Sequence, residues 1–279
     1  MYFLAMKTPL IITALLVATV TNAQMVQGID ESKLYAQTKQ VNQFFRRFNG
    51  EENEKGDRYY PEDKQYRNVK LRKKYLEILF DAGNSGMSPE LKTEFAKTVL
   101  DKSNPATLDF HRPDWFCEVH TIFNFKGKSI PVILFMELEN AQLGSKWVIS
   151  KVYSTAFEAE FKRDTARVGK FLHPMSHELD FMNLRKAFLY PDSVSQFATK
   201  RFAPDHLTLF LYEARTGTLK FETVEGLRFH FFQIDGWYFE VAQFNRPGYN
   251  TGWLIANLVK LNGEADKNVL RKYLYHESR

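Results

Sequence analysis

Four residues of this chain could form acid–base pairs. His111 and Asp114 lie three residues apart. Glu118 and His120 lie two residues apart in a predicted β-strand, so they share one strand face. An imidazole beside a carboxylate can take or give a proton near neutral pH. These four are therefore the candidate catalytic residues. The alternatives are a surface loop or pocket lip for the first pair, and a solvated or helix-covered strand face for the second.

Motifs for a metal or a phosphate have simpler structural explanations. The segment 173–180 (HPMSHELD) is rich in metal-ligand residue types, but Pro174 and Ser176 place a helix start between its two histidines. A capping role is therefore favoured over a metal or catalytic site. The segment Gly127-Lys128-Ser129 lacks the upstream glycine of a phosphate-binding loop. We expect no metal and no cofactor.

The single cysteine, Cys117, excludes an internal disulfide bond. It alternates with Val119 and Phe123 on the apolar face of its strand, which predicts a buried thiol without a catalytic role. The core alone must then hold the fold, and a chain of 279 residues is long enough for that.

An aromatic hairpin over residues 227–244 is the candidate binding site. Counted from a two-residue turn at Asp235-Gly236, Phe232 would pair with Phe239 on one face. The opposite face would carry the candidate ligand- or partner-binding residues, which are Phe229, Phe231, Tyr238 and Glu240. Both faces are apolar, and helices of the same domain can cover only one. We expect the second face to contact the first half of the chain or to form an open aromatic pocket.

These residues must be positioned by helices and strands. Apolar spacing near 3.6 predicts helices over 33–50 and 69–82, and Ser88 with Pro89 is typical of the start of a third. The charged segment 51–68 between the first two helices is interpreted as a solvated loop, with a binding arm as the alternative.

The apolar period then changes to two. Strands are predicted over 117–125 and 130–138, joined by a turn at Lys126-Gly127, with a third strand over 146–152. A two-residue turn sets the register, which pairs Phe123 with Ile130, Val119 with Leu134 and Cys117 with Met136.

The second half repeats this order. After a linker over 155–172, helices are predicted from Ser176 to about 190 and from Asp192 to about 202. The alternation of Leu207, Leu209 and Leu211 predicts a strand. The aromatic hairpin and a last strand over 251–258 follow.

An internal repeat supports two related units. The segments 144–152 (GSKWVISKV) and 250–258 (NTGWLIANL) carry tryptophan, an aliphatic residue and isoleucine at the same steps. We interpret them as the closing strands of two copies of a small α+β unit. Chance similarity of two β-rich segments is the alternative.

Helices followed by a curved antiparallel sheet, closed by a W-x-I-x-x-V strand, resemble the nuclear-transport-factor-two-like (cystatin-like) superfamily. Residues 147–152 match this pattern, and residues 253–258 match with leucine for the final valine. The resemblance implies an α+β fold in which a bent sheet wraps the helices into a cone with an internal pocket. It predicts two cone-like units in tandem, over 24–154 and 173–279. The superfamily includes enzymes, binding modules and assembly domains, so it implies no single function.

The first 23 residues have the pattern of a secretory signal peptide. A positive start at Met6-Lys7 precedes an apolar run over 10–18 and a small-x-small site ending at Ala23. The run is shorter than the roughly 20 residues of a membrane span. We expect cleavage after Ala23, a secreted or periplasmic protein, and no later membrane span.

Composition narrows the classes of function. Hydrophobic residues at 44% and charged residues at 25% exclude wholesale disorder. The net charge of +5 is small and spread along the chain, so no nucleic-acid partner is expected.

The leading hypothesis is an exported non-catalytic protein that binds a small ligand or a partner protein through a cone pocket or the domain junction. The second is a cone-type hydrolase or isomerase with a His–carboxylate pair. The third is a structural component of the envelope. A histidine and a carboxylate that meet inside a pocket would favour the enzyme.

Overall fold

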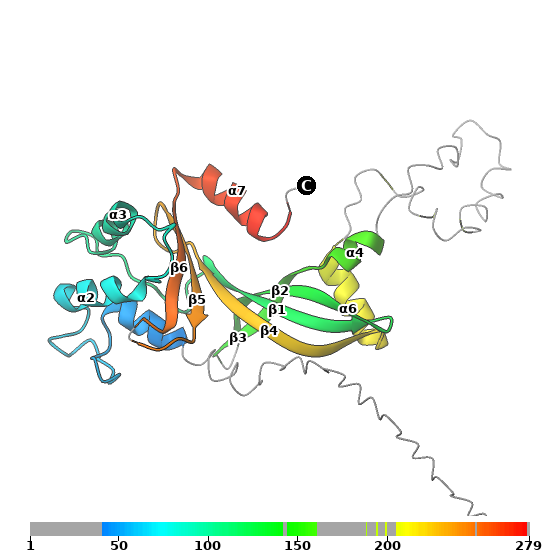
Figure 1. The fold of residues 1–279 in the computed structure, drawn as a ribbon, viewed down its shortest axis with the longest axis horizontal. Coiled ribbons are helices and arrows are strands. Elements are labelled where there is room, and N and C mark those ends of the chain that lie inside the picture. The colour runs from blue at the N-terminus through cyan, green and yellow to red at the C-terminus, as the bar shows by residue number, and fades with distance from the viewer. Residues whose placement is uncertain are drawn as a thin grey trace, which may run out of the picture.

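A six-stranded antiparallel sheet with helices on both faces forms the centre of the molecule, an α+β fold as predicted (Figure 1). The computed structural model describes residues 41–141, 144–160, 188, 194, 199, 205–248 and 250–277. Within these residues the strand order is β3-β2-β1-β4-β5-β6. The strands are β1 (Trp115–Phe125), β2 (Lys128–Ala141), β3 (Gly144–Tyr153), β4 (Leu219–Phe231), β5 (Trp237–Phe244) and β6 (Gly252–Lys260).

The first hairpin has the predicted register. The three predicted pairs are all observed: Phe123 with Ile130, Val119 with Leu134 and Cys117 with Met136. Both turn residues have the left-handed backbone that tight hairpin turns require, with φ of 52° at Lys126 and 82° at Gly127. Local alternation and turn chemistry were sufficient to predict this hairpin.

The second hairpin differs from the prediction by one residue. Phe231, and not Phe232, lies opposite Phe239. The amide of Phe232 donates instead to the carbonyl oxygen of Asp114 at 2.7 Å, outside the hairpin. Tyr238 consequently lies on the opposite face of the sheet from Phe231, so the prediction that these two rings share a face is wrong.

Trp147 and Trp253 lie on β3 and β6, the two edge strands of one sheet. The interpretation of these strands as the closing strands of two repeated α+β units is therefore wrong. The reason is that β1 and β4, the first strands of two three-stranded meanders, pair with each other along their length. Both tryptophan rings still reach the same residue, with centroids 6.4 and 5.0 Å from that of Phe229.

Three helices precede the sheet, as predicted. Residues 41–49 are helical, and α2 (Val69–Leu79) and α3 (Pro89–Val99) follow. The side chain of Asn68 accepts two backbone hydrogen bonds at the start of α2, and that of Ser88 accepts one at the start of α3. These caps satisfy amides that a helix leaves unpaired at its N-terminus.

Residues 206–216 form helix α6 (His206–Thr216), where the leucine alternation over 207–211 predicted a strand. The prediction is wrong because the flanking residues are helix caps. The carboxylate of Asp205 accepts from two backbone amides of the first turn, and Gly217 ends the helix with φ of 77°. Phe210 is the side chain that this helix buries.

The remaining helices cover different parts of the sheet. Helix α4 (Thr155–Glu160) occupies the start of the expected linker and joins α6 at one end of the long strands (Figure 1). Helix α7 (Glu264–Leu274), which the sequence analysis did not predict, packs Leu270 and Leu274 on the opposite face.

One hydrophobic core contains residues from both halves of the chain. The ring of Phe44, from the first helix, lies 6.0 Å from that of Phe231. The ring of Phe95, from α3, lies 5.6 Å from that of Phe239. The first helix and α3 thus pack on β4 and β5, which come from the second half of the chain.

Several predictions concern residues outside this description. They are the signal peptide, the histidine-rich segment 173–180 and almost all of the two helices over 176–202. Among the helices that are described, none is long and apolar enough to cross a membrane.

Candidate functional site

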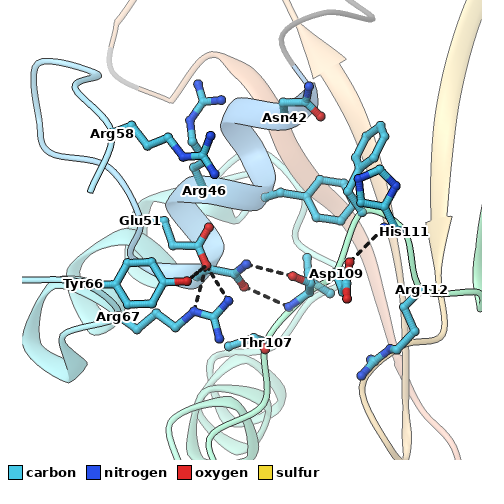
Figure 2. Close-up of a pocket in the computed structure, with 14 residues that line it drawn as sticks. Asn42, Arg46, Glu51, Arg58, Tyr66, Arg67, Thr107, Asp109, His111 and Arg112 are labelled. Atoms are coloured by element: carbon cyan, nitrogen blue, oxygen red, sulfur yellow. Dashed lines mark hydrogen bonds and ion pairs between the residues drawn. The ribbon is translucent and has the colours of Figure 1, made fainter. Parts of the chain in front are cut away.

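An arginine-lined cleft of about 670 Å³ lies between the first helix, the loop over 51–68 and the loop before β1 (Figure 2). Phe45 and Phe110 contribute aromatic wall. The charged and titratable lining consists of Arg46, Arg58, Arg67, Arg112 and His111 against Glu51 and Asp109. Four permanent positive charges against two carboxylates give the cleft a positive potential.

The carboxylate of Glu52 holds two arginines beside this cleft. Its side chain is completely buried and accepts from Nε of Arg46 at 3.0 Å and from Nε of Arg47 at 2.8 Å. Each arginine keeps about a third of its side chain exposed. The pairing therefore fixes the two arginine stems without removing their guanidinium groups from solvent.

Glu51 organises the other side of the cleft. Its Oε1 accepts from Nε of Arg67 at 2.8 Å, from Nη2 at 2.7 Å and from the hydroxyl of Tyr66 at 3.3 Å, the contacts drawn in Figure 2. Burial and the nearby carboxylate raise the pKa of Tyr66, so this hydroxyl remains a donor. Arg67 is thus held in one orientation at the cleft wall.

Two side-chain amides hold the loop that forms the third wall. Asn49 donates to the carbonyl of Leu108 at 2.8 Å and accepts from its amide at 2.9 Å. Gln233, buried at the β4–β5 turn, accepts from the amide of Asp109 at 2.9 Å and donates to the carbonyls of Asp109 and Arg112. The helix and the sheet together therefore position this loop.

A buried arginine lies beneath the cleft. Arg72 is 1% exposed; its Nε donates to the carbonyl of Phe48 at 3.4 Å and its Nη2 to that of Ala106. Burial lowers the pKa of Arg72 to about 10, so it stays charged at neutral pH. Gly50 has φ of 72°, and a Cβ there would meet Arg72 Cγ at 2.6 Å, so glycine is required.

Arg58 and Arg46 are the donors that remain available to a ligand. Within the described ranges Arg58 has no ion pair, and its guanidinium lies 5.2 Å from the ring of Tyr60. Arg46 uses only Nε for its ion pair with Glu52. Arg112, by contrast, donates from Nη2 to the carbonyl of Gln233 at 2.6 Å and is held there.

His111 and Asp114 do not form a pair. His111 lines the arginine-lined cleft and a smaller cleft of about 310 Å³, and its Nδ1 lies 3.0 Å from Oγ of Ser145. Asp114 lines the smaller cleft but not the arginine-lined one, and it pairs with Nη2 of Arg271 at 2.5 Å and Nζ of Lys267 at 3.5 Å. His111 is a lip residue, and Asp114 anchors α7.

Glu118 and His120 do meet, in a larger network. Oε1 of Glu118 lies 2.6 Å from Nε2 of His120, and Oε2 lies 2.7 Å from Nε2 of His230. Nδ1 of His230 is 2.9 Å from the hydroxyl of Tyr238. Glu118 and His120 were predicted from the sequence to share a strand face. His230 was not predicted to join them, because the pairing of β1 with β4 arises only in the tertiary structure.

The ionisation of Glu118 indicates which nitrogen atoms of this network carry hydrogen. Burial alone would raise the pKa of Glu118, but the hydrogen bonds from both histidines outweigh it and hold the pKa well below the usual value. An ionised carboxylate only accepts, so both Nε2 atoms carry hydrogen. Burial raises the pKa of Tyr238, whose hydroxyl lies within hydrogen-bond distance of Nδ1 of His230. The side chain of His120 is 35% exposed.

The hairpin candidates are not brought together in an open pocket. Phe229 and Phe231 are fully buried, and the ring of Phe231 lies 5.4 Å from that of Phe45 in the first helix. Tyr238 is buried on the other face. Glu240 lies 3.6 Å from Arg228.

Cys117 is buried, as predicted, and burial raises the pKa of its thiol. No cluster of three or more metal-ligand side chains occurs in the part of the chain that the structure describes.

The arginines of the cleft were not singled out from the sequence. The signal was the charge density of residues 51–68, which favoured a solvated loop over a binding arm. The folded loop decides which charges are paired. It brings Glu51 and Glu52 to neighbouring arginines, and it leaves Arg58 without an ion pair among the described residues.

The site has no counterpart in a matching protein from which a role could be transferred. No family model, no curated protein and no solved structure matches this chain.

Proposed function

We propose that this chain is an exported, non-catalytic protein that binds a small anionic ligand in the arginine-lined cleft. The observation that carries the proposal is the lining: four guanidinium groups and an imidazole face two carboxylates in a cleft of about 670 Å³. That volume is within the usual range of small-molecule sites.

The chemistry of the donors selects the ligand class. Guanidinium groups bind carboxylate or phosphate oxygens in a planar, bidentate arrangement and stack on aromatic surfaces. Arg58 and Arg46 supply such donors, and Phe45 and Phe110 supply apolar wall. A carboxylate or phosphate attached to a small apolar or aromatic body satisfies both features.

The test is calorimetric titration with four anions: phosphate, pyrophosphate, citrate and benzoate. We expect at least one to bind, and the double variant Arg46→Ala/Arg58→Ala to weaken it about tenfold or more, the loss of one or two charge-assisted hydrogen bonds. Arg215→Ala, an exposed arginine on α6, is the matched control and should leave binding unchanged. Equal binding by both variants, or binding of none of the four anions, contradicts the proposal.

Export is the second part of the proposal and rests on the sequence of residues 1–23. Amino-terminal sequencing of exported material should begin at Gln24. A mature protein that still carries Met1 or Met6 contradicts it.

We also propose a distant relation to the nuclear-transport-factor-two-like superfamily. Helices that precede an antiparallel sheet support it, as does the shared strand order within each meander. The junction of the two meanders in one sheet is the departure from a simple tandem of cones.

One observation favours a second candidate, a hydrolase or isomerase with a His–carboxylate pair. The 2.6 Å contact between Glu118 and His120 orients the imidazole as carboxylates do in catalytic dyads. Neither residue lines the two clefts described above. Hydrolysis of p-nitrophenyl acetate beyond that of free imidazole, lost in both His120→Asn and Glu118→Gln, would support this function, and its absence would exclude it for activated esters.

A further inference from the structure

A second and larger cleft, of about 920 Å³, lies between helices α2 and α3. Its apolar lining comes from Leu76 and Phe80 on the α2 side and from Ala96 and Leu100 on the α3 side. None of these residues lines the arginine-lined cleft, so this groove is a separate site.

Three lysines surround this apolar floor. They are Lys73, Lys92 and Lys97, and none of them has an ion pair within the described ranges. Nζ of Lys92 lies 5.6 Å from the ring centroid of Phe80, so one ammonium group already lies over the floor. Lysines extend flexible apolar stems along a surface while the ammonium stays at its edge.

The acidic residues of the groove are fewer than its lysines, although Lys92 also interacts electrostatically with Asp81 outside the lining. Asp101 accepts hydrogen bonds from the amides of Ser103 and Asn104 in its own turn, which hold its carboxylate there. Glu77 is exposed and is the other carboxylate of the lining. Three ammonium groups thus share the groove with two carboxylates, which leaves a net charge of +1 among these five side chains.

We propose that this groove binds a single-chain anionic amphiphile, with the acyl chain on the apolar floor and a carboxylate or phosphate head group among the three lysines. An apolar floor edged by more lysines than carboxylates is complementary to an apolar chain that carries an anionic head group. The proposal does not depend on the function proposed for the arginine-lined cleft.

The experiment titrates the full chain with dodecanoate, dodecyl phosphate and dodecyltrimethylammonium, each below its critical micelle concentration. We expect saturable one-to-one binding of both anions and no comparable binding of the cation. The tighter anion identifies the head group. In the series octanoate, decanoate and dodecanoate, affinity should rise about fourfold per methylene group until the floor is filled.

Two variants test separately whether binding depends on the lysine charges and on the open volume of the groove. The triple variant Lys73→Glu/Lys92→Glu/Lys97→Glu should weaken dodecanoate at least tenfold, whereas the matched control Lys64→Glu/Lys128→Glu/Lys220→Glu should not. Thr93→Trp, at an exposed position of the groove on α3, should also block binding without a change of charge. Circular dichroism checks that each variant is folded.

Three results would overturn the proposal. They are no saturable binding of either anion, equal binding of dodecyltrimethylammonium, and dodecanoate binding that survives both the charge reversal and Thr93→Trp. The double variant Arg46→Ala/Arg58→Ala should retain dodecanoate binding. Its loss there would assign the amphiphile to the arginine-lined cleft and would likewise overturn the proposal.

Discussion

Glu52 and Glu118 are both buried glutamates that bridge two basic side chains, but the partners differ in type and in exposure to solvent. Glu52 lies in a loop and bridges Arg46 and Arg47, each about one-third exposed. Glu118 lies on a central strand and bridges His120 and His230, of which the second is 1% exposed.

This difference suits the site around Glu52 to ligand binding and the site around Glu118 to stabilising the fold. Around Glu52 the positive charges are permanent and reach solvent, so an anion can meet them at any physiological pH. Around Glu118 the two basic side chains are imidazoles, and that of His230 is buried between Glu118 and Tyr238. The loop site is therefore suited to a ligand, and the strand site couples protonation to stability.

The largest expected effect distinguishes the two glutamates directly. Glu118→Ala should lower the free energy of unfolding by about 3 kcal/mol, because it leaves His230 buried without its partner. Glu52→Ala should cost about 1 kcal/mol, because its arginines can be solvated where they stand. Urea unfolding at pH 7 measures both values. Equal losses would remove the distinction between the two sites.

A somewhat smaller effect tests how the loop of the arginine-lined cleft is held. Gln233→Leu should cost about 2 kcal/mol, because it leaves backbone groups of Asp109 and Arg112 without partners. Gln243→Leu is the matched control: the buried Oε1 of Gln243 has no hydrogen-bond partner, so its loss should be nearly neutral. If both variants unfold at the same urea concentration, Gln233 does not hold the loop.

A third comparison uses two buried tyrosines. Tyr238→Phe and Tyr75→Phe should each cost about 1 kcal/mol, because each removes one hydrogen bond. Only Tyr238→Phe should shift the imidazole resonances of His230 in an NMR spectrum, because Tyr75 donates to the backbone carbonyl of Glu52. An unchanged His230 spectrum would contradict the proposed network.

The smallest expected effect is a slope with pH. The pKa of Glu118 is lowered in the folded chain, below the unfolded value of about 4.3, so the unfolded chain binds more protons between the two values. Stability from this group is present above about pH 4.3 and is lost as the pH falls through the folded pKa. Glu118→Gln should therefore flatten the decline in unfolding midpoint between about pH 5 and pH 3. A parallel decline in both proteins would contradict this role.

The candidate site was predictable only in part. His111 was named as a candidate, with a surface loop or a pocket lip as alternatives, and Glu118 with His120 as a pair on one strand face, because these residues lie close together in sequence. The arginines over 46–67 were not identified, because charge density does not reveal which charges are paired. His230 was missed because its contact with Glu118 crosses 112 residues of sequence.

The sequence by itself determined what short-range physics controls. Side-chain alternation and a two-residue turn set the register of β1 with β2, and Asn68 and Ser88 set the starts of α2 and α3. These features depend on interactions within a few residues.

The tertiary structure alone decided the rest. The pairing of β1 with β4 joined two meanders into one sheet, and the contact of Phe232 with Asp114 shifted the second hairpin by one residue. At α6 the packing of Phe210 against Phe123 of β1 supports a helix where the alternation of leucines predicted a strand. The physical reason is that edge pairing, loop anchoring and burial depend on partners distant in sequence, which no local pattern specifies.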